Sequence, residues 1–201
     1  MLKKDLLSGI SAGMVIALGG SVFLACENRY VGAVLFCVAL LCICYKGYAL
    51  FTGKVGYIPE AHGKAEWQLL LLCLLGNLIG TFICGAAVRY AIPSIGETAL
   101  AICTAKLEQA ALSTLIRGVF CGLLMYLAVS IFRDSKTPMG ILFCIPVFIL
   151  SGFEHSIADM FYFAASGIVS AKACGFLWIV IIGNAIGGML LPALKIWGEK
   201  Q

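Results

Sequence analysis

Charge is scarce in this sequence. Asp, Glu, Lys and Arg make up only 12% of its 201 residues, whereas 62% are hydrophobic, and the mean hydropathy is +1.03. A water-soluble domain of this size needs a polar surface that so few charges cannot supply. The composition therefore predicts an integral membrane protein. The net charge of +4 is too small to indicate nucleic acid as a partner.

Histidine is scarce as well. The chain has two histidines, His62 and His155, and a haem held between helices normally takes a pair at one depth. We expect His62 in a loop, far in depth from His155. An intramembrane zinc protease would need a motif such as His-Glu-x-x-His, which is absent. These absences argue against a membrane-anchored redox subunit, the main alternative class of membrane protein. We therefore expect no enzyme, no cofactor and no metal.

Six apolar stretches are long enough to cross a bilayer, which takes roughly 20 residues per helix. They cover about 8–26, 31–58, 67–90, 107–132, 139–169 and 174–197. The first lacks a small-x-small cleavage site, so we expect it to be a retained span. The second and fifth are too long for one simple span and contain polar or glycine interruptions.

An even number of spans places both termini on one side, and basic residues indicate which side that is. With the N-terminus inside, eight basic residues fall inside and four fall outside. The inside set is Lys3, Lys4, Lys54, Lys64, Arg133, Lys136, Lys195 and Lys200, and the outside set is Arg29, Arg89, Lys106 and Lys172. We therefore expect both termini in the cytoplasm, with Lys46 and Arg117 left within spans.

Glycine motifs recur in the two halves of the chain. A Gly-x-x-x-Gly at 9–13 returns at 118–122, and a Gly-Asn-x-x-Gly at 76–80 returns at 183–187. Close packing of helices explains each motif alone but not the repetition. With three spans in each half, the second half starts on the opposite side of the membrane. We therefore expect one domain, 1–201, built from two inverted repeats at about 1–92 and 105–201.

The interruption in the fifth stretch carries three titratable side chains. Glu154, His155 and Asp159 follow Gly152 closely and would lie near the middle of the bilayer. An ionisable side chain costs a few kcal/mol or more at that depth, so such a cluster persists mainly where it is paired or lines a wet cavity. We interpret these residues as part of a functional site.

The interruption in the second stretch contains Lys46-Gly47 and Thr52-Gly53. These pairs predict a helix break, where backbone groups are freed inside the membrane. Half-helix N-termini at a break present N–H groups and a positive dipole, which suit a small anion. We expect Thr52 and His155 to face each other across the break. The predicted fold is an all-α membrane protein of six transmembrane helices, with helices two and five broken around a pore.

The interrupted segments resemble those of the formate/nitrite transporter family. The similarity covers SGFEHSIADMF at 151–161, Leu-Phe-Thr at 50–52 and both Gly-Asn-x-x-Gly motifs. This resemblance implies an aquaporin-like protomer with its own pore, assembled as a homo-pentamer in the inner membrane. It also implies a small monovalent anion as substrate, with formate as our first choice and nitrite or hydrosulfide as alternatives.

The resemblance also implies roles for single residues. His155 matches the central pore histidine, Thr52 its partner, and Lys106 the lysine that attracts anions to the outer vestibule. The apolar constrictions fall at Phe36, Leu40 and Phe148, for which packing or lipid contact is the alternative. Histidine exchanges a proton near neutral pH, so His155 would either protonate the anion or only bond to it.

Three positions depart from the family pattern. Asp159 stands where the family usually has Asn. The family also usually has an Asn near the position of Gly122, and that amide is missing here. Arg117 stands where an apolar residue is usual. Because unpaired buried charges are costly, we expect Arg117 to pair with Asp159 or Glu154. On one continuous helix it would share a face with Lys106, about 16 Å away. The alternative is an arginine that reaches lipid or a neighbouring protomer.

Lys46 is a second surplus cation, beside the break in the second stretch. It would either strengthen the attraction of anions or pair with a carboxylate such as Glu154.

Overall fold

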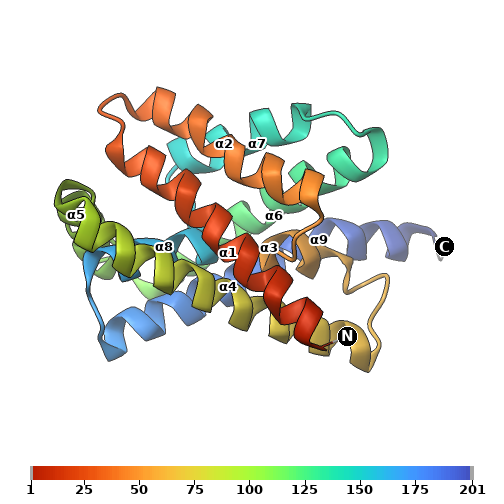
Figure 1. Ribbon diagram of the computed structural model, residues 1–201. Coiled ribbons are helices and arrows are strands. Elements are labelled where there is room, and N and C mark those ends of the chain that lie inside the picture. The colour runs from red at the N-terminus through yellow and green to blue at the C-terminus, as the bar shows by residue number, and fades with distance from the viewer. Residues whose placement is uncertain (1, 200–201) are drawn as a thin grey trace.

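The computed structural model describes residues 2–199, and every regular element in that range is a helix (Figure 1). The elements are α1 (Leu2–Ala25), α2 (Arg29–Lys46), α3 (Phe51–Lys54), the 3-10 turn η1 (Val55–Tyr57), α4 (Lys64–Ala91), α5 (Pro93–Leu107), α6 (Ala111–Ser135), α7 (Met139–Leu150), α8 (Ser156–Ser166) and α9 (Ala171–Glu199). In the described part, α1, α2, α4, α6 and α9 are long and apolar enough to cross a membrane, and α7 is a shorter apolar helix. The predicted all-helical membrane fold is therefore confirmed.

Two pairs of long helices cross at close range, α1 with α4 and α6 with α9. The glycine motifs lie at these crossings. A Cβ built on Gly9 would lie 2.9 Å from the carbonyl oxygen of Cys73, and one on Gly118 would lie 3.1 Å from Cα of Gly183. Only small residues allow backbones to approach so closely in a lipid environment. The repeated glycines thus set the crossing of both helix pairs.

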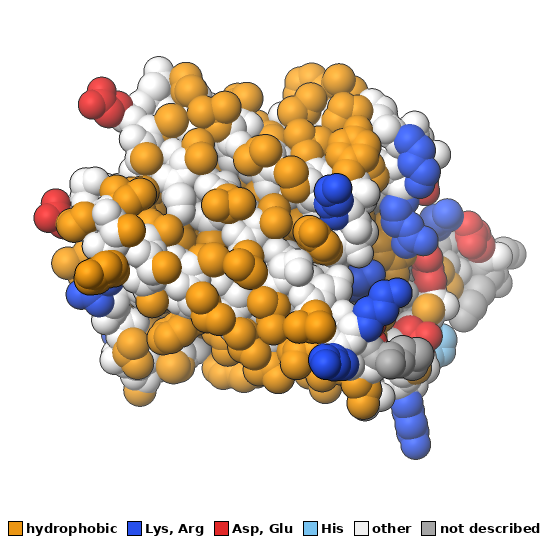
Figure 2. Space-filling model, viewed as in Figure 1, with side chains coloured by type: hydrophobic (Ala, Val, Ile, Leu, Met, Phe, Trp, Pro, Cys, Tyr) orange, Lys and Arg blue, Asp and Glu red, His pale blue; other side chains and the backbone are white. Residues whose placement is uncertain are grey.

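The start of α1 and the end of α9 lie on the same side of the molecule, at the right of Figure 1. The links between η1 and α4 and between α6 and α7 lie on that side too, whereas α5 lies at the opposite end. On the face seen in Figure 2, most Lys and Arg side chains gather near the termini. One of the lysines counted on that side, Lys200, lies outside the described residues.

The two over-long stretches are each divided by a short non-helical link. Helix α2 ends at Lys46 and α3 begins at Phe51, while α7 ends at Leu150 and α8 begins at Ser156. Each link contains a glycine with positive φ, 69° at Gly47 and 71° at Gly152. Glycine adopts this left-handed backbone without a steric penalty, which lets the chain turn out of the helix.

Two buried asparagines bond the backbone at these links. Asn77 of α4 accepts a hydrogen bond from Phe51 N (2.9 Å) and donates to the carbonyl oxygens of Gly9 (2.8 Å) and Ala49 (2.9 Å). Asn184 of α9 repeats the pattern. It accepts from Ser156 N (2.8 Å) and donates to the carbonyl oxygens of Gly118 (2.9 Å) and Glu154 (2.8 Å). Each side-chain amide thus bonds one N–H and one carbonyl that a helix break leaves without partners, together with one carbonyl of the helix that it crosses.

Helix α5 was not foreseen as an element. It begins after Ile92, with Pro93 at its first position, where the missing N–H of proline costs no helical hydrogen bond. It ends at Leu107, and α6 begins only at Ala111. Lys106 and Arg117 therefore lie on separate helices, and the expectation of a shared helix face is wrong.

We expect Gly122→Leu to destabilise the protein. A Cβ at this position would lie 2.8 Å from Gly188 N and 2.9 Å from Asn184 Cα, both of them backbone atoms of α9 that cannot move independently. Overpacking of this kind costs about 1–3 kcal/mol. Thermal unfolding in detergent should show a lower Tm than the wild type.

The matched control is Gly175→Leu, in the same helix as Asn184 but with no atom within 4 Å of its Cβ position. It should leave the Tm close to that of the wild type. An equal loss in both variants would contradict the role of Gly122 at the helix crossing.

Candidate functional site

Thr52 and His155 meet inside the protein, one from each interrupted segment. Thr52 lies on α3 and His155 is the N-cap of α8. Thr52 Oγ1 lies 2.9 Å from His155 Nε2, and the two residues are 1% and 3% exposed. The predicted contact across the break is therefore present.

The second ring nitrogen of His155 indicates the tautomer. Nδ1 accepts a hydrogen bond of 3.1 Å from Ala158 N in the first turn of α8. A neutral imidazole has one donor and one acceptor nitrogen. With Nδ1 assigned as the acceptor, Nε2 carries the hydrogen and donates it to Thr52 Oγ1. Within residues 2–199 the Thr52 hydroxyl donates to no other group, so its hydrogen is available to a ligand.

Two phenylalanine rings pack in succession next to the imidazole of His155. The rings of Phe148 and His155 stack with centroids 5.6 Å apart and an interplanar angle of 24°. Phe36 meets Phe148 edge to face at 6.3 Å. Leu40, one turn along α2 from Phe36, is buried as well. All three side chains are therefore buried in the protein rather than facing lipid, and Phe148 packs directly against the histidine.

A cavity of about 450 Å³, here called the α5 cavity, lies on one side of the Thr52–His155 contact. Its lining includes His155 and Phe148 together with Lys106, Gln109, Arg29, Arg117, Glu154 and Asp159. A second cavity of about 340 Å³, here called the α3 cavity, has none of these lining residues. Its lining includes Leu40, Leu50 and Tyr57 together with Lys54, Arg133 and Lys136.

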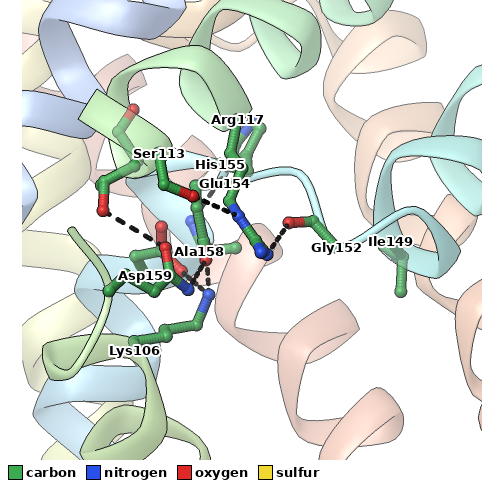
Figure 3. A network of polar contacts seen from close by, with 12 residues as sticks. Lys106, Ser113, Arg117, Ile149, Gly152, Glu154, His155, Ala158 and Asp159 are labelled. Atoms are coloured by element: carbon green, nitrogen blue, oxygen red, sulfur yellow. Dashed lines mark hydrogen bonds and ion pairs between the residues drawn. The ribbon is translucent and has the colours of Figure 1, made fainter. Parts of the chain in front are cut away.

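Lys106 reaches from α5 to two carboxylates (Figure 3). Its ammonium forms an ion pair with Glu154 and lies 3.0 Å from Asp159 Oδ1. Gln109 Nε2 donates to the other oxygen of Glu154 at 2.8 Å. Lys106 therefore lines the α5 cavity, and two negative charges lie against its positive one.

Arg117 does not form the predicted ion pair. Its Nη1 donates to the carbonyl oxygen of Gly152 at 3.0 Å, and its Nε donates to Ser113 Oγ at 3.3 Å (Figure 3). Among the described residues, both Glu154 and Asp159 pair with Lys106 instead. The prediction is wrong because α5, which the sequence analysis did not foresee, brings a different cation to the carboxylates.

Lys46 lies exposed at the end of α2 and lines neither cavity. Within residues 2–199 it forms no ion pair with Glu154, so that pairing is wrong too.

Several residues that line the two cavities were not predicted as site residues from the sequence. Arg29 Nη2 donates to the carbonyl oxygen of Ile149 at 3.1 Å, close to the bond that Arg117 makes with Gly152. At the α3 cavity the guanidinium of Arg133 lies over the ring of Tyr57, 4.1 Å from its centroid. These basic residues had been counted only as indicators of orientation, and nothing in their spacing indicated a shared cavity.

Comparison with known proteins identifies the family of this chain. The model of the formate/nitrite transporter family matches residues 2–198. The chain is 30% identical to an uncharacterized transporter, YwcJ, of Bacillus subtilis, over 94% of this chain and 84% of the relative. It is 27% identical to the nitrite transporter NirC of Salmonella typhimurium (94% and 77% covered) and 26% identical to the formate channel FocA of Escherichia coli (84% and 73%).

Solved structures share the fold. An FNT family ion channel superposes with a TM-score of 0.82 at 24% identity, covering 98% of this chain and 89% of the other. A structure described as a pentameric formate channel with formate bound gives a TM-score of 0.80, also at 24% identity, covering 99% and 97%. The chain is therefore a multi-pass membrane protein that belongs to the formate/nitrite transporter family.

Proposed function

We propose that this protein is a channel for small monovalent weak-acid anions, with formate as the first candidate and nitrite or hydrosulfide as alternatives. Relatives named as a nitrite transporter and as formate channels are almost equally similar to this chain, so similarity alone does not choose the anion. Formate takes first place because one structural neighbour is described as holding it. That the named relatives are transporters and channels supports transport rather than catalysis.

The observation that carries the proposal is the buried Thr52–His155 contact, with His155 lining the α5 cavity and with Leu50 and Gly53, close to Thr52 in the chain, lining the α3 cavity. An anion that leaves either cavity for the apolar slit at Phe36 and Phe148 must give up hydration, which is costly for a charge. At that slit the Thr52 hydroxyl is the available hydrogen-bond donor, and His155 Nε2–H, which donates to Thr52 Oγ1 in this structure, can donate to an anion in place of that bond. A donor there lowers the barrier for a small anion more than for a neutral solute.

His155 acts on the anion in one of two ways. It donates a hydrogen bond to an anion that passes as a charge, or it passes a proton to it so that a neutral acid crosses. Passage of the charged anion makes the flux electrogenic, whereas passage of the neutral acid makes it electroneutral. A measurement of the membrane potential generated during transport therefore distinguishes the two mechanisms.

Positive charge at both cavities would concentrate anions. The lining of the α3 cavity carries Lys54, Arg133 and Lys136, with no carboxylate among its lining residues in the described chain. At the α5 cavity the charge of Lys106 is offset by its two carboxylates, so we assign much of the attraction there to Arg29 and Arg117, which bond only uncharged groups. The attraction expected of one lysine is thus spread over several cations.

We further propose a homo-pentamer in the inner membrane with both termini in the cytoplasm. The pentamer is supported by the description of the formate channel neighbour. The orientation is supported by the basic side chains that gather near both termini (Figures 1 and 2). The matching bonds of Asn77 and Asn184 support two inverted repeats, about 1–92 and 105–201, within one domain.

We expect His155→Ala to lower anion flux about tenfold or more, since a lost hydrogen bond to a charged group costs about 1.5–3 kcal/mol. The measurement is uptake of formate, nitrite, hydrosulfide and lactate into proteoliposomes. His62→Ala, in the exposed link before α4, is the matched control and should transport like the wild type. Passage of glycerol by the wild type without any anion flux would contradict the proposal and favour a neutral-solute channel.

We expect Phe36→Leu to widen the slit and raise the ratio of lactate to formate flux several-fold. Phe36 is 2% exposed and meets Phe148 edge to face, so a smaller side chain frees space next to the His155 stack. Phe143→Leu is the control because Phe143 lies on α7, as Phe148 does, but is 70% exposed. If the ratio in Phe36→Leu equals that of the wild type, Phe36 does not form the constriction.

A further inference from the structure

The ion cluster at the α5 cavity does not balance its charges. One cation, Lys106, lies between two carboxylates, Glu154 and Asp159, and the side chains are 14%, 3% and 1% exposed. If all three were ionised, the cluster would carry a net charge of −1 inside the membrane. A buried unpaired charge is strongly unfavourable, and two coupled carboxylates commonly relieve it by holding a proton.

The hydrogen bonds indicate which carboxylate holds it. One oxygen of Glu154 pairs with Lys106 and the other accepts from Gln109, so Glu154 is bonded as an anion. Asp159 contacts Lys106 through Oδ1 only. Its Oδ2 is buried and has no hydrogen-bond partner among the described residues. An ionised oxygen without a donor is costly at that depth, whereas a protonated one carries no charge.

The geometry points to Asp159 as a proton-binding site that sets the charge of the α5 cavity and thereby the rate at which anions enter the pore. This inference rests on the proposed anion channel. It assigns to Asp159 a different task from that of His155, because the proton on Asp159 stays at the cavity wall and is not passed to the anion.

The other groups around Asp159 do not remove the need for a proton. The titratable or charged residues near it are Cys103 and Lys106 of α5, Arg117 and Cys121 of α6, Glu154 and His155 before α8, Tyr162 of α8, and, across the cavity, Arg29 and Cys26. Helices α1, α4 and α9 contribute no titratable side chain to the described lining of this cavity. Cysteine thiols and tyrosine are neutral in their ordinary state near pH 7.

The two arginines near Asp159 bond backbone carbonyls instead of its carboxylate. Arg29 donates to the carbonyl oxygen of Ile149 and Arg117 to that of Gly152, and neither forms an ion pair with Asp159 within the described chain. With a proton on Asp159, the cluster is neutral and the cavity keeps the positive charge of both arginines. Without the proton, one negative charge offsets one of them. Anion entry should therefore be faster when Asp159 is protonated, that is, at lower pH on the α5 side.

The test compares formate flux in wild type and Asp159→Asn proteoliposomes while the pH on the α5 side is varied from about 5 to 8. The wild-type flux should fall several-fold as pH rises. Asp159→Asn keeps the shape of the side chain but cannot lose a proton, so its flux should stay high across the range. Glu108→Gln is the control, because Glu108 is an exposed carboxylate beside Lys172 at the same end, and it should keep the wild-type profile.

A second variant and a spectrum keep the test decisive if Asp159→Asn fails to fold. Asp159→Glu retains a titrating carboxyl group and should retain a pH-dependent flux. Infrared difference spectra between the low and the high end of this pH range should show, for the wild type, the carbonyl band of a buried protonated carboxylic acid. Glu108→Gln should keep this band. A wild type without this band, or an Asp159→Asn profile that follows the wild type, would overturn the inference. Absence of any anion flux in the wild type would instead overturn the proposed function, and the infrared band would still report on Asp159.

Discussion

A backbone can leave its helix inside a bilayer only where other groups bond the amides and carbonyls that it frees, because each unsatisfied group costs several kcal/mol in lipid. Two buried asparagines meet this constraint. Asn77 and Asn184 each bond one amide and one carbonyl of a break and one carbonyl of the partner helix at the crossing. The breaks can therefore exist in the membrane, and they in turn place Thr52 and His155 in contact.

Polar groups around the two breaks are divided by position. His155 and Thr52 bond each other beside the buried Phe148 ring without a fixed charge. In the proposed channel a fixed charge at that point would hold an anion too tightly for it to leave. The full charges line the α5 and α3 cavities instead. At the α5 cavity, Arg29 bonds the carbonyl oxygen of Ile149 in the last turn of α7, and Arg117 bonds that of Gly152 in the link just beyond, near the negative end of the helix dipole. Both arginines therefore stabilise this helix end and keep positive charge beside the α5 cavity.

Much of the fold and part of the site were predictable from residue patterns. The apolar stretches located the spans, and the interruptions located both breaks, because ionisable side chains are too costly in lipid to occur without a role and glycine lets the chain leave the helix. The contact between Thr52 and His155 followed from the two breaks. The partner of Arg117 was predicted wrongly, because the choice among nearby cations depends on how α5 packs against α8, and Pro93 and the short apolar run after it did not reveal that helix.

The sequence alone determined that this chain crosses a membrane and to which family it belongs, because hydropathy and the 151–161 motif are local properties that need no knowledge of packing. Only the tertiary structure decided the electrostatics of the α5 cavity. It placed Lys106 between Glu154 and Asp159, left Asp159 Oδ2 without a partner, and directed two arginines to backbone carbonyls. Charges interact through space over a few ångströms, and residues as distant in sequence as Arg29 and Ile149 become neighbours only once the helices have packed.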